Sequence, residues 1–170
     1  ARQINTIDAS STPGGASIDV QLQNNFLRAR DIPGLGGRNF WVENFRNVTG
    51  TQNRDNIDGN AADNVLNGLG GNDGVFGRGG NDILFGGAET DFVTGDEGND
   101  ILNGTDAIAR GRGEIDDLEG GTGNDRFIFG DRSGSFYKFN GDSDSVGVRD
   151  FSTGDVIQLG LGETYRAVSR

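Results

Sequence analysis

Carboxylate side chains recur at a fixed spacing through the middle of this 170-residue chain. Residues 50–103 divide into six consecutive nine-residue units, each of which opens with Gly and holds Asp or Asn at its sixth place. The sixth-place residues are Asp55, Asn64, Asp73, Asp82, Asp91 and Asp100. Carboxylate and amide oxygens are hard ligands, and because the chain contains no His and no Cys, they favour Ca²⁺ over Zn²⁺. The first chemistry that the sequence predicts is therefore calcium binding.

The same spacing predicts the elements that must position these carboxylates. Each Gly-rich run tolerates the positive φ of a tight turn, and the residues after the sixth place suit a short strand. An aliphatic residue stands at every eighth place: Ile57, Leu66, Val75, Leu84, Val93 and Leu102. Because successive strand residues face opposite ways, the eighth place should face a core and places seven and nine should face outward. A period this short predicts stacked coils with two units in each coil.

Two units to a coil would stack the turns in two columns. One column would hold Asp55, Asp73 and Asp91, and the other Asn64, Asp82 and Asp100. Carboxylates at the strand spacing of about 5 Å would repel by a few kcal/mol per pair at an effective dielectric constant near 20. Cations between adjacent turns would remove this repulsion. We therefore expect at least four ions, placed between Asp55 and Asp73, Asp73 and Asp91, Asn64 and Asp82, and Asp82 and Asp100.

The period breaks after Asn103 and then returns. Residues 104–110 are interpreted as an inserted loop, after which residues 111–130 hold two more units with Asp116 and Asp125 at their sixth places. If the inserted loop keeps the columns in phase, two further ions would pair Asp91 with Asp116 and Asp100 with Asp125.

The flanking segments are predicted to close the two ends of the stack. Residues 1–49 contain strand-like fragments at 5–10, 17–22 and 46–49 but no complete unit, so we interpret them as degenerate coils that stack without calcium. Residues 21–30 suit either a short helix or a crossing loop.

Residues 131–170 are interpreted as a C-terminal cap, with closing strands at 146–159. Asp150 and Asp155 in that segment either bind another ion or are solvated, and loop carboxylates are more often solvated.

These nonapeptides resemble the repeats of the RTX, or haemolysin-type, calcium-binding family. The resemblance covers at least residues 50–103. It implies an all-β fold, a right-handed parallel β-roll (β-solenoid) forming one domain over residues 1–170, with each calcium between adjacent turns. It also implies ligation by main-chain carbonyls of the Gly-rich runs, at Gly68, Gly70, Gly77, Gly79, Gly86, Ala88 and Gly95. Export by a type I route to the cell surface or medium, and folding there, would follow as in the family.

The acidic charge of the chain is concentrated in the repeats. Residues 50–130 hold 16 Asp and Glu against 5 Arg, a difference of −11 that equals the formal net charge of the whole chain. Such a surface attracts cations and is a poor partner for nucleic acid. No apolar stretch approaches the length of a membrane span.

Six outward places are apolar where a solvated roll would prefer polar residues: Val65, Phe76, Ile83, Phe85, Phe92 and Ile101. Two explanations are open. Either the N-terminal segment or the loop at 130–145 covers these side chains, or they contact a neighbouring copy or domain. A head-to-tail contact between copies that does not close would build a homo-oligomer or filament.

Three classes of function are compatible with these features. The first is a secreted structural or adhesive protein whose calcium-bound roll is itself the function. The second is a secretion and folding module of a larger extracellular enzyme or toxin. The third is an enzyme, such as a glycosidase with paired carboxylates. We expect no enzyme, because the sixth-place carboxylates already have a ligand role and the chain offers no His or Cys for acid, base or nucleophilic chemistry.

Overall fold

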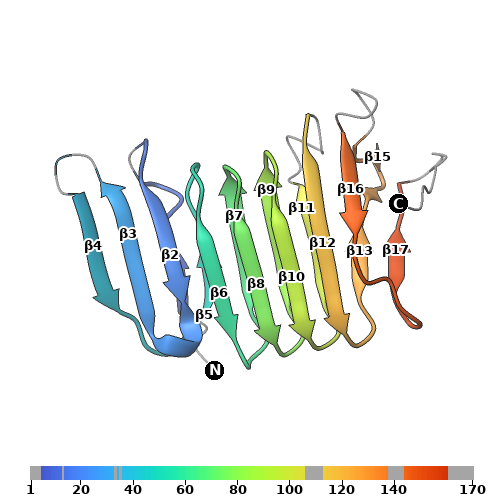
Figure 1. Cartoon of the computed structure of the whole chain (residues 1–170), viewed down its shortest axis with the longest axis horizontal. Coiled ribbons are helices and arrows are strands. Elements are labelled where there is room, and N and C mark those ends of the chain that lie inside the picture. Colours follow the sequence, from blue (N-terminus) through green and yellow to red (C-terminus); the bar gives the residue numbers. More distant parts are fainter. Residues whose placement is uncertain are drawn as a thin grey trace.

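The computed structural model of the chain is an all-β protein whose strands form two facing layers (Figure 1). It describes residues 5–12, 14–32, 34, 36–105, 113–137 and 144–160. Sheet A contains β1 (Asn5–Asp8), β5 (Phe45–Thr49), β7 (Val65–Gly70), β9 (Ile83–Ala88), β11 (Ile101–Thr105), β13 (Arg126–Ile128) and β17 (Val156–Gln158). Sheet B contains β2 (Ser17–Gln21), β3 (Phe26–Ile32), β4 (Gly36–Trp41), β6 (Asn56–Asn60), β8 (Gly74–Gly79), β10 (Phe92–Glu97), β12 (Ile115–Thr122) and β16 (Ser145–Val148). A small hairpin joins β14 (Gly130–Asp131) to β15 (Gly134–Ser135).

The chain passes from one sheet to the other at every turn of the repeat block. Sheet A runs in the order β1-β5-β7-β9-β11-β13-β17, and sheet B in the order β16-β12-β10-β8-β6-β2-β3-β4. Neighbouring strands of the repeat block are parallel and in register, so that Leu66 lies beside Leu84 and Ile57 beside Val75. The predicted all-β fold with parallel sheets is confirmed, whereas its right-handed winding and its single-domain extent stay predictions.

The insertion after the sixth unit leaves both sheets in phase. Leu102 pairs with Phe127, and Val93 pairs with Leu118. These partners are 25 residues apart instead of 18, because the extra residues are accommodated in one turn. Gly104 and Thr105 are the last residues of β11 rather than the start of the inserted loop. The rest of that loop, with the predicted opener Gly111, lies outside the described residues.

The core between the sheets is built from one residue per nonapeptide. All eight eighth-place side chains are fully buried: Ile57, Leu66, Val75, Leu84, Val93, Leu102, Leu118 and Phe127. This confirms the inward direction predicted from the strand period. Burying such a side chain contributes about 1.5–3 kcal/mol, so a core only one side chain deep per strand gives modest stabilisation.

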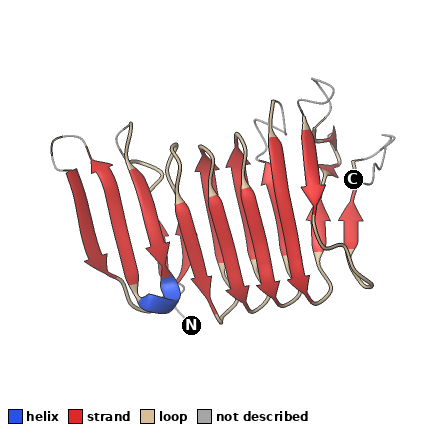
Figure 2. Ribbon diagram, viewed as in Figure 1, coloured by secondary structure: helices blue, strands red, loops and turns tan. Residues whose placement is uncertain are grey.

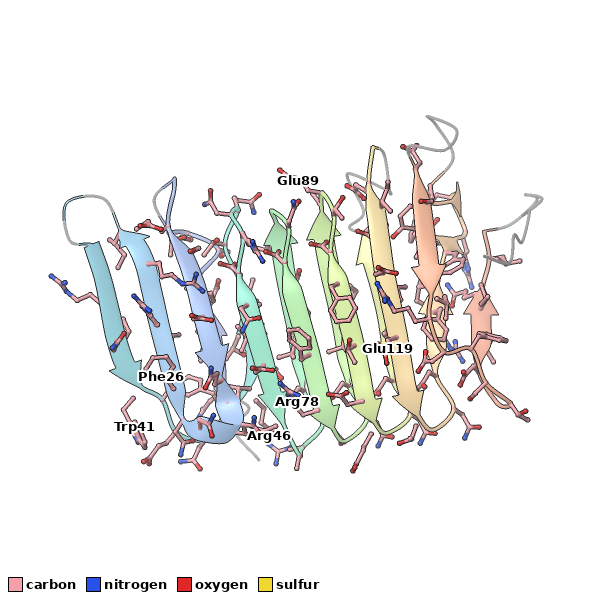
Figure 3. The ribbon with its side chains drawn as sticks, viewed as in Figure 1. Phe26, Trp41, Arg46, Arg78, Glu89 and Glu119 are labelled. Atoms are coloured by element: carbon pink, nitrogen blue, oxygen red, sulfur yellow. The ribbon has the colours of Figure 1, made fainter. Side chains whose placement is uncertain are left out.

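The N-terminal end differs from the predicted lead-in coils. Strands β1, β2 and β5 do stack in parallel on the repeats, but β3 and β4 extend sheet B as antiparallel strands (Figure 2). Leu22–Asn24 form a 3-10 turn, and Asn25 adopts a left-handed φ of 55° that reverses the chain direction. Residues 26–30 are therefore strand, neither helix nor crossing loop. Phe26 pairs with Trp41 at the lower left of the side-chain view (Figure 3).

No helix among the described residues is long and apolar enough to cross a membrane.

Candidate metal centre

The turns between the sheets stack along two edges of the molecule (Figure 1). The turns of column one lead from sheet A to sheet B along the upper edge, where Glu89 is labelled (Figure 3). The turns of column two lead from sheet B to sheet A along the lower edge, where Arg46 is labelled. Column one contains Asp55, Asp73, Asp91 and Asp116. Column two contains Asn64, Asp82, Asp100, Asp125 and, in addition, Asp155.

A ladder of hydrogen bonds links the sixth-place residues of each column. In column one, the N–H of Asp55 donates to Oδ1 of Asp73 at 2.7 Å, and the next two steps measure 2.8 and 2.9 Å. In column two, the N–H of Asn64 donates to Oδ1 of Asp82 at 2.7 Å, and the following steps to Asp100 and Asp125 measure 2.7 and 2.9 Å. Each predicted pair of sixth-place residues therefore lies in adjacent turns, including the two pairs that depended on the inserted loop.

The second carboxylate oxygen, Oδ2, of several sixth-place residues accepts no hydrogen bond from the described part of the protein. Among the described residues, Oδ2 is buried without a hydrogen-bond partner in five sixth-place residues: Asp73, Asp82, Asp91, Asp100 and Asp125. A buried acceptor without a partner costs about 1–3 kcal/mol, and more when it is charged. Five repetitions of one unpartnered oxygen at equivalent positions of the two columns indicate that a cation completes these turns.

The opening glycine of each unit lies against that oxygen. A Cβ added to Gly68 would lie 2.3 Å from Oδ2 of Asp73 and 2.4 Å from the carbonyl oxygen of Gly86 in the next coil. The carbonyls of Gly68, Gly77, Gly86 and Gly95 all take part in such approaches. A side-chain oxygen and a carbonyl oxygen thus converge beside each opener from Gly50 to Gly95, and such oxygens are the donors that Ca²⁺ prefers. A side chain on the opener would fill this space.

The other predicted carbonyl ligands lie elsewhere in the turn. Gly70, Gly79 and Ala88 are the last residues of β7, β8 and β9. Ala88 pairs with Gly70 across the sheet, and Gly79 lies near Ala61 and Glu97. The structure places these three residues in the correct turns, and their role as ligands stays a prediction.

Burial raises the pKa of the sixth-place Asp carboxyls from Asp55 to Asp125 in the metal-free chain. Desolvation is the largest cause throughout, and it raises the pKa of Asp73 to about 8 and that of Asp91 to about 9 from the usual 3.8. The pKa values of Asp82 and Asp100 rise to about 7 and about 6 for the same reason. Neighbouring carboxylates add to the effect, as Asp116 does at Asp91. Without a cation, these groups favour a proton over a negative charge.

At three sixth-place residues near the column ends, protein groups donate hydrogen bonds to the side-chain oxygens. Oδ2 of Asp55 accepts the N–H of Thr51 at 2.6 Å, and its Oδ1 accepts the N–H of Ile18 at 2.6 Å. Oδ1 of Asn64 accepts the N–H of Asn60 at 2.9 Å, and Oδ2 of Asp116 accepts the hydroxyl of Tyr137 at 2.6 Å. These residues need a cation less than the five with an unpartnered oxygen.

Each candidate site draws on more than one turn. The described residues contain no group of three or more acidic side chains already arranged to hold a metal ion. A calcium ion would therefore be held by two sixth-place side chains together with main-chain carbonyls of adjacent turns. The chemistry of the donors fits calcium, whose flexible coordination accepts such mixed oxygen sets.

Sequence analysis missed the hydroxyl of Tyr137, which no repeat pattern indicates. It named Asp155 as either an ion ligand or a solvated carboxylate, but it did not place this residue in column two, although the sequence does signal that continuation. Residues 150–158 (DFSTGDVIQ) form a unit in which Asp150 replaces the opening Gly, with Asp155 at the sixth place and Ile157 at the eighth. Val156 and Ile157 pair with Arg126 and Phe127, as the repeat register requires.

Comparison with protein families gives an independent result. The model of the RTX calcium-binding nonapeptide repeat matches in four copies, over residues 49–84, 76–107 and 110–131. A search of curated proteins returns no match. The matched segments contain all eight sixth-place residues from Asp55 to Asp125 and the turns in which carboxylate and carbonyl oxygens converge. The repeat region of this chain therefore belongs to the RTX calcium-binding nonapeptide family.

Proposed function

We propose that this chain is an exported calcium-binding structural module whose repeat block folds when it meets extracellular calcium. The observation that carries the proposal is the set of five buried carboxylate oxygens, at equivalent positions of the two columns, that have no hydrogen-bond partner among the described residues. No enzymatic activity is part of this proposal. Calcium acts here as a structural ligand, because it neutralises the columns and joins one coil to the next.

The physical basis is the coupling of ion binding to folding. The core is one side chain deep per strand, and the Gly-rich turns lose much conformational entropy when they order. An ion that binds only the folded turns adds its binding free energy to folding. Extracellular calcium modules bind at about 10⁻⁴ to 10⁻³ M, so folding would follow export to the cell surface or medium.

The test is a calcium titration of metal-free protein followed by far-UV circular dichroism. We expect a cooperative gain of β signal with Ca²⁺ and none with Mg²⁺ at the same concentration, since Mg²⁺ dehydrates reluctantly and demands a small octahedral site. A metal-free protein that is already fully folded and unchanged by calcium would contradict the proposal.

A second candidate function is self-association through sheet A. On sheet B, the rings of Phe76 and Phe92 lie 5.8 Å apart, and the guanidinium groups of Arg78 and Arg149 each lie 5.5 Å from one ring centre. Two arginines of the chain therefore lie against these outward aromatics on sheet B.

On sheet A, Val65, Ile83 and Ile101 lie side by side on three neighbouring strands, and Val65 is 39% exposed. This aliphatic row supports contact with a second copy. Sedimentation of the calcium-bound protein tests it: Ile83→Lys should reduce any larger species, while Asn81→Lys in a nearby exposed turn should not. A wild-type protein that sediments as a monomer at all concentrations would exclude self-association.

The alternative role, as a secretion and folding module of a larger enzyme or toxin, shares the same calcium chemistry. The two roles differ in the mass of the native secreted protein. A product much larger than 18.0 kDa in which this roll is covalently joined to another domain would favour the module.

A further inference from the structure

We propose that column two has one more calcium site, beyond the matched nonapeptides, in which Asp125 and Asp150 supply the carboxylates. Asp155 is a positioning residue in this site. The inference rests on the proposed calcium binding of the columns. It concerns residues 150–158, which follow the last matched residue, 131.

Strand β17 continues the roll with the same turn geometry as the repeats. The N–H of Asp125 donates to Oδ1 of Asp155 at 2.9 Å, which is the ladder bond found at every earlier step of the column. Oδ2 of Asp155 accepts the N–H of Ser152 at 2.6 Å. Both oxygens of Asp155 are therefore used in fixing the turn beside Asp125.

Asp150 takes the place that a glycine opener has elsewhere. Leu118 pairs with Val148, so Asp150 lies opposite Gly120 in the next coil. Its two oxygens accept the N–H groups of Gly120 and Gly121 at 2.9 and 2.6 Å. In the interior of the column the residue opposite an opener is a glycine, which offers only a main-chain carbonyl oxygen, whereas Asp150 adds a carboxylate beside Gly120.

The unpartnered oxygen of Asp125 points to the same place. Asp125 is only 1% exposed, and its Oδ2 has no hydrogen-bond partner among the described residues. A Cβ added to Gly120 would lie 2.4 Å from that oxygen, so Asp125 and Asp150 both approach Gly120. Two carboxylates that meet at one glycine, one of them buried with an unpartnered oxygen, call for a cation between them.

The end of column one offers a contrast within the same molecule. There the next coil has Val146 beside Asp116, and the hydroxyl of Tyr137 satisfies Oδ2 of Asp116. Column one is thus closed by a protein group, whereas column two ends on a carboxylate pair. We infer that the two columns have different numbers of ions.

The extra ion would fasten the last described strand to the roll. Val156 is 51% exposed and Ile157 36% exposed, so apolar burial holds β17 only weakly. An ion at Asp125 and Asp150 would attach the turn that leads into β17.

The test counts calcium ions bound to the full chain after equilibrium dialysis and follows hydrogen exchange of the β17 amides. Asp150→Asn should lower the count by one ion per chain and speed exchange at Val156–Gln158. Asp155→Asn should also lose one ion, and it provides a second variant if Asp150→Asn folds poorly. Asp8→Asn is the matched control, because Asp8 likewise accepts a backbone N–H, from Ser10, but lies in β1, at the opposite end of sheet A from β17.

The outcomes separate this inference from the function on which it rests. If the wild-type chain binds calcium and folds, but both variants keep its full ion count, the additional site is excluded and the proposed function stands. If the wild-type chain binds no calcium, both fail.

Discussion

At the scale of single residues, the two oxygens of one carboxylate have different partners. Oδ1 of each interior sixth-place Asp accepts a main-chain N–H from the preceding coil, whereas Oδ2 is left for a cation. One side chain therefore serves both the protein ladder and the ion. This division predicts that each interior Asp affects two neighbouring sites.

Asp82→Ala tests this directly. Asp82 lies between Asn64 and Asp100, so its removal should weaken the two calcium sites on either side of it together. Isothermal titration calorimetry should show two fewer strong sites per chain. Asp63→Ala is the control, because it removes one carboxylate at an exposed place in the neighbouring turn of the same column. Unchanged stoichiometry and affinity in Asp82→Ala would refute the bridging role.

The raised pKa values predict how the metal-free protein responds to pH. The folded pKa of Asp100 is about 6 and that of Asp91 about 9, against 3.8 for an ordinary Asp. A raised folded pKa means that the folded state binds its proton more tightly than the unfolded state does. This stabilisation is complete below pH 3.8 and is lost as the pH rises through these folded values.

Metal-free protein should therefore show more β signal at pH 5 than at pH 9. Asp91→Asn should make the β signal depend less on pH, because Asp91 has a higher pKa than Asp73, Asp82 and Asp100. Circular dichroism of protein freed of calcium by dialysis measures both effects. More structure at pH 9 than at pH 5 would contradict the role assigned to the buried carboxyls.

At the scale of elements, each turn needs space beside its opening glycine. A Cβ on Gly86 would come within 2.4 Å of Oδ2 of Asp91 and 2.5 Å of the carbonyl oxygen of Gly104. Neither atom can move far, since both belong to the stacked turns that form the column.

Gly86→Ala should destabilise the calcium-bound protein by about 1–3 kcal/mol or more, as overpacking of a tight site does. It should also raise the calcium concentration at the folding midpoint. Urea unfolding at fixed calcium measures the first effect and a calcium titration the second. Gly37→Ala is the matched control, because the nearest atom to its added Cβ is 3.5 Å away. Equal behaviour of the two variants would show that the opener is not constrained.

The residues that follow the β14–β15 hairpin close column one through Tyr137. Tyr137→Phe would remove only the hydroxyl that donates to Oδ2 of Asp116, leaving a buried oxygen without that partner. Loss of such a partner costs about 1–3 kcal/mol. Urea unfolding at saturating calcium should show this loss. Phe129→Leu, which alters the ring packed against Tyr137 but keeps the hydroxyl, separates packing from hydrogen bonding. An unchanged urea midpoint in Tyr137→Phe would show that this hydroxyl does not stabilise the end of column one.

At the scale of the whole molecule, dependence on calcium is uneven along the roll. The coils around β8 to β11 contain Asp73, Asp82, Asp91 and Asp100, each with an unpartnered buried oxygen. The N-terminal coil is different, because Thr51 and Ile18 satisfy Asp55, and Val20 and Leu27 add a buried core under β2 and β3.

Removing calcium with a chelator should therefore expose the amides of β8 to β11 first and those of β2 and β3 last. Hydrogen exchange followed by mass spectrometry resolves the two regions. Simultaneous loss of protection along the whole chain would indicate that the roll unfolds as one cooperative unit.

The limits of sequence reasoning appear at the N-terminal end of the roll. The strand-like fragments predicted at 5–10, 17–22 and 46–49 do stack in parallel as β1, β2 and β5, but the antiparallel strands β3 and β4 were not predicted. Residues 26–41 lack the Gly-Asp period, and a single left-handed residue, Asn25, reverses the chain before them. Local fragments such as Ser17–Gln21 were still recognisable as strands, since alternation of side chains needs no distant partner.

The sequence by itself determined the alternation of turn and strand, the inward eighth place and the membership of the two columns. These properties depend only on a nine-residue period and on the two-residue period of a strand, both of which can be counted along the chain. Only the tertiary structure decided which column atoms have protein partners. Ile18 lies 37 residues from Asp55, and Tyr137 lies 21 residues from Asp116. No local pattern encodes such contacts, because they form only when separate coils and their end segments stack.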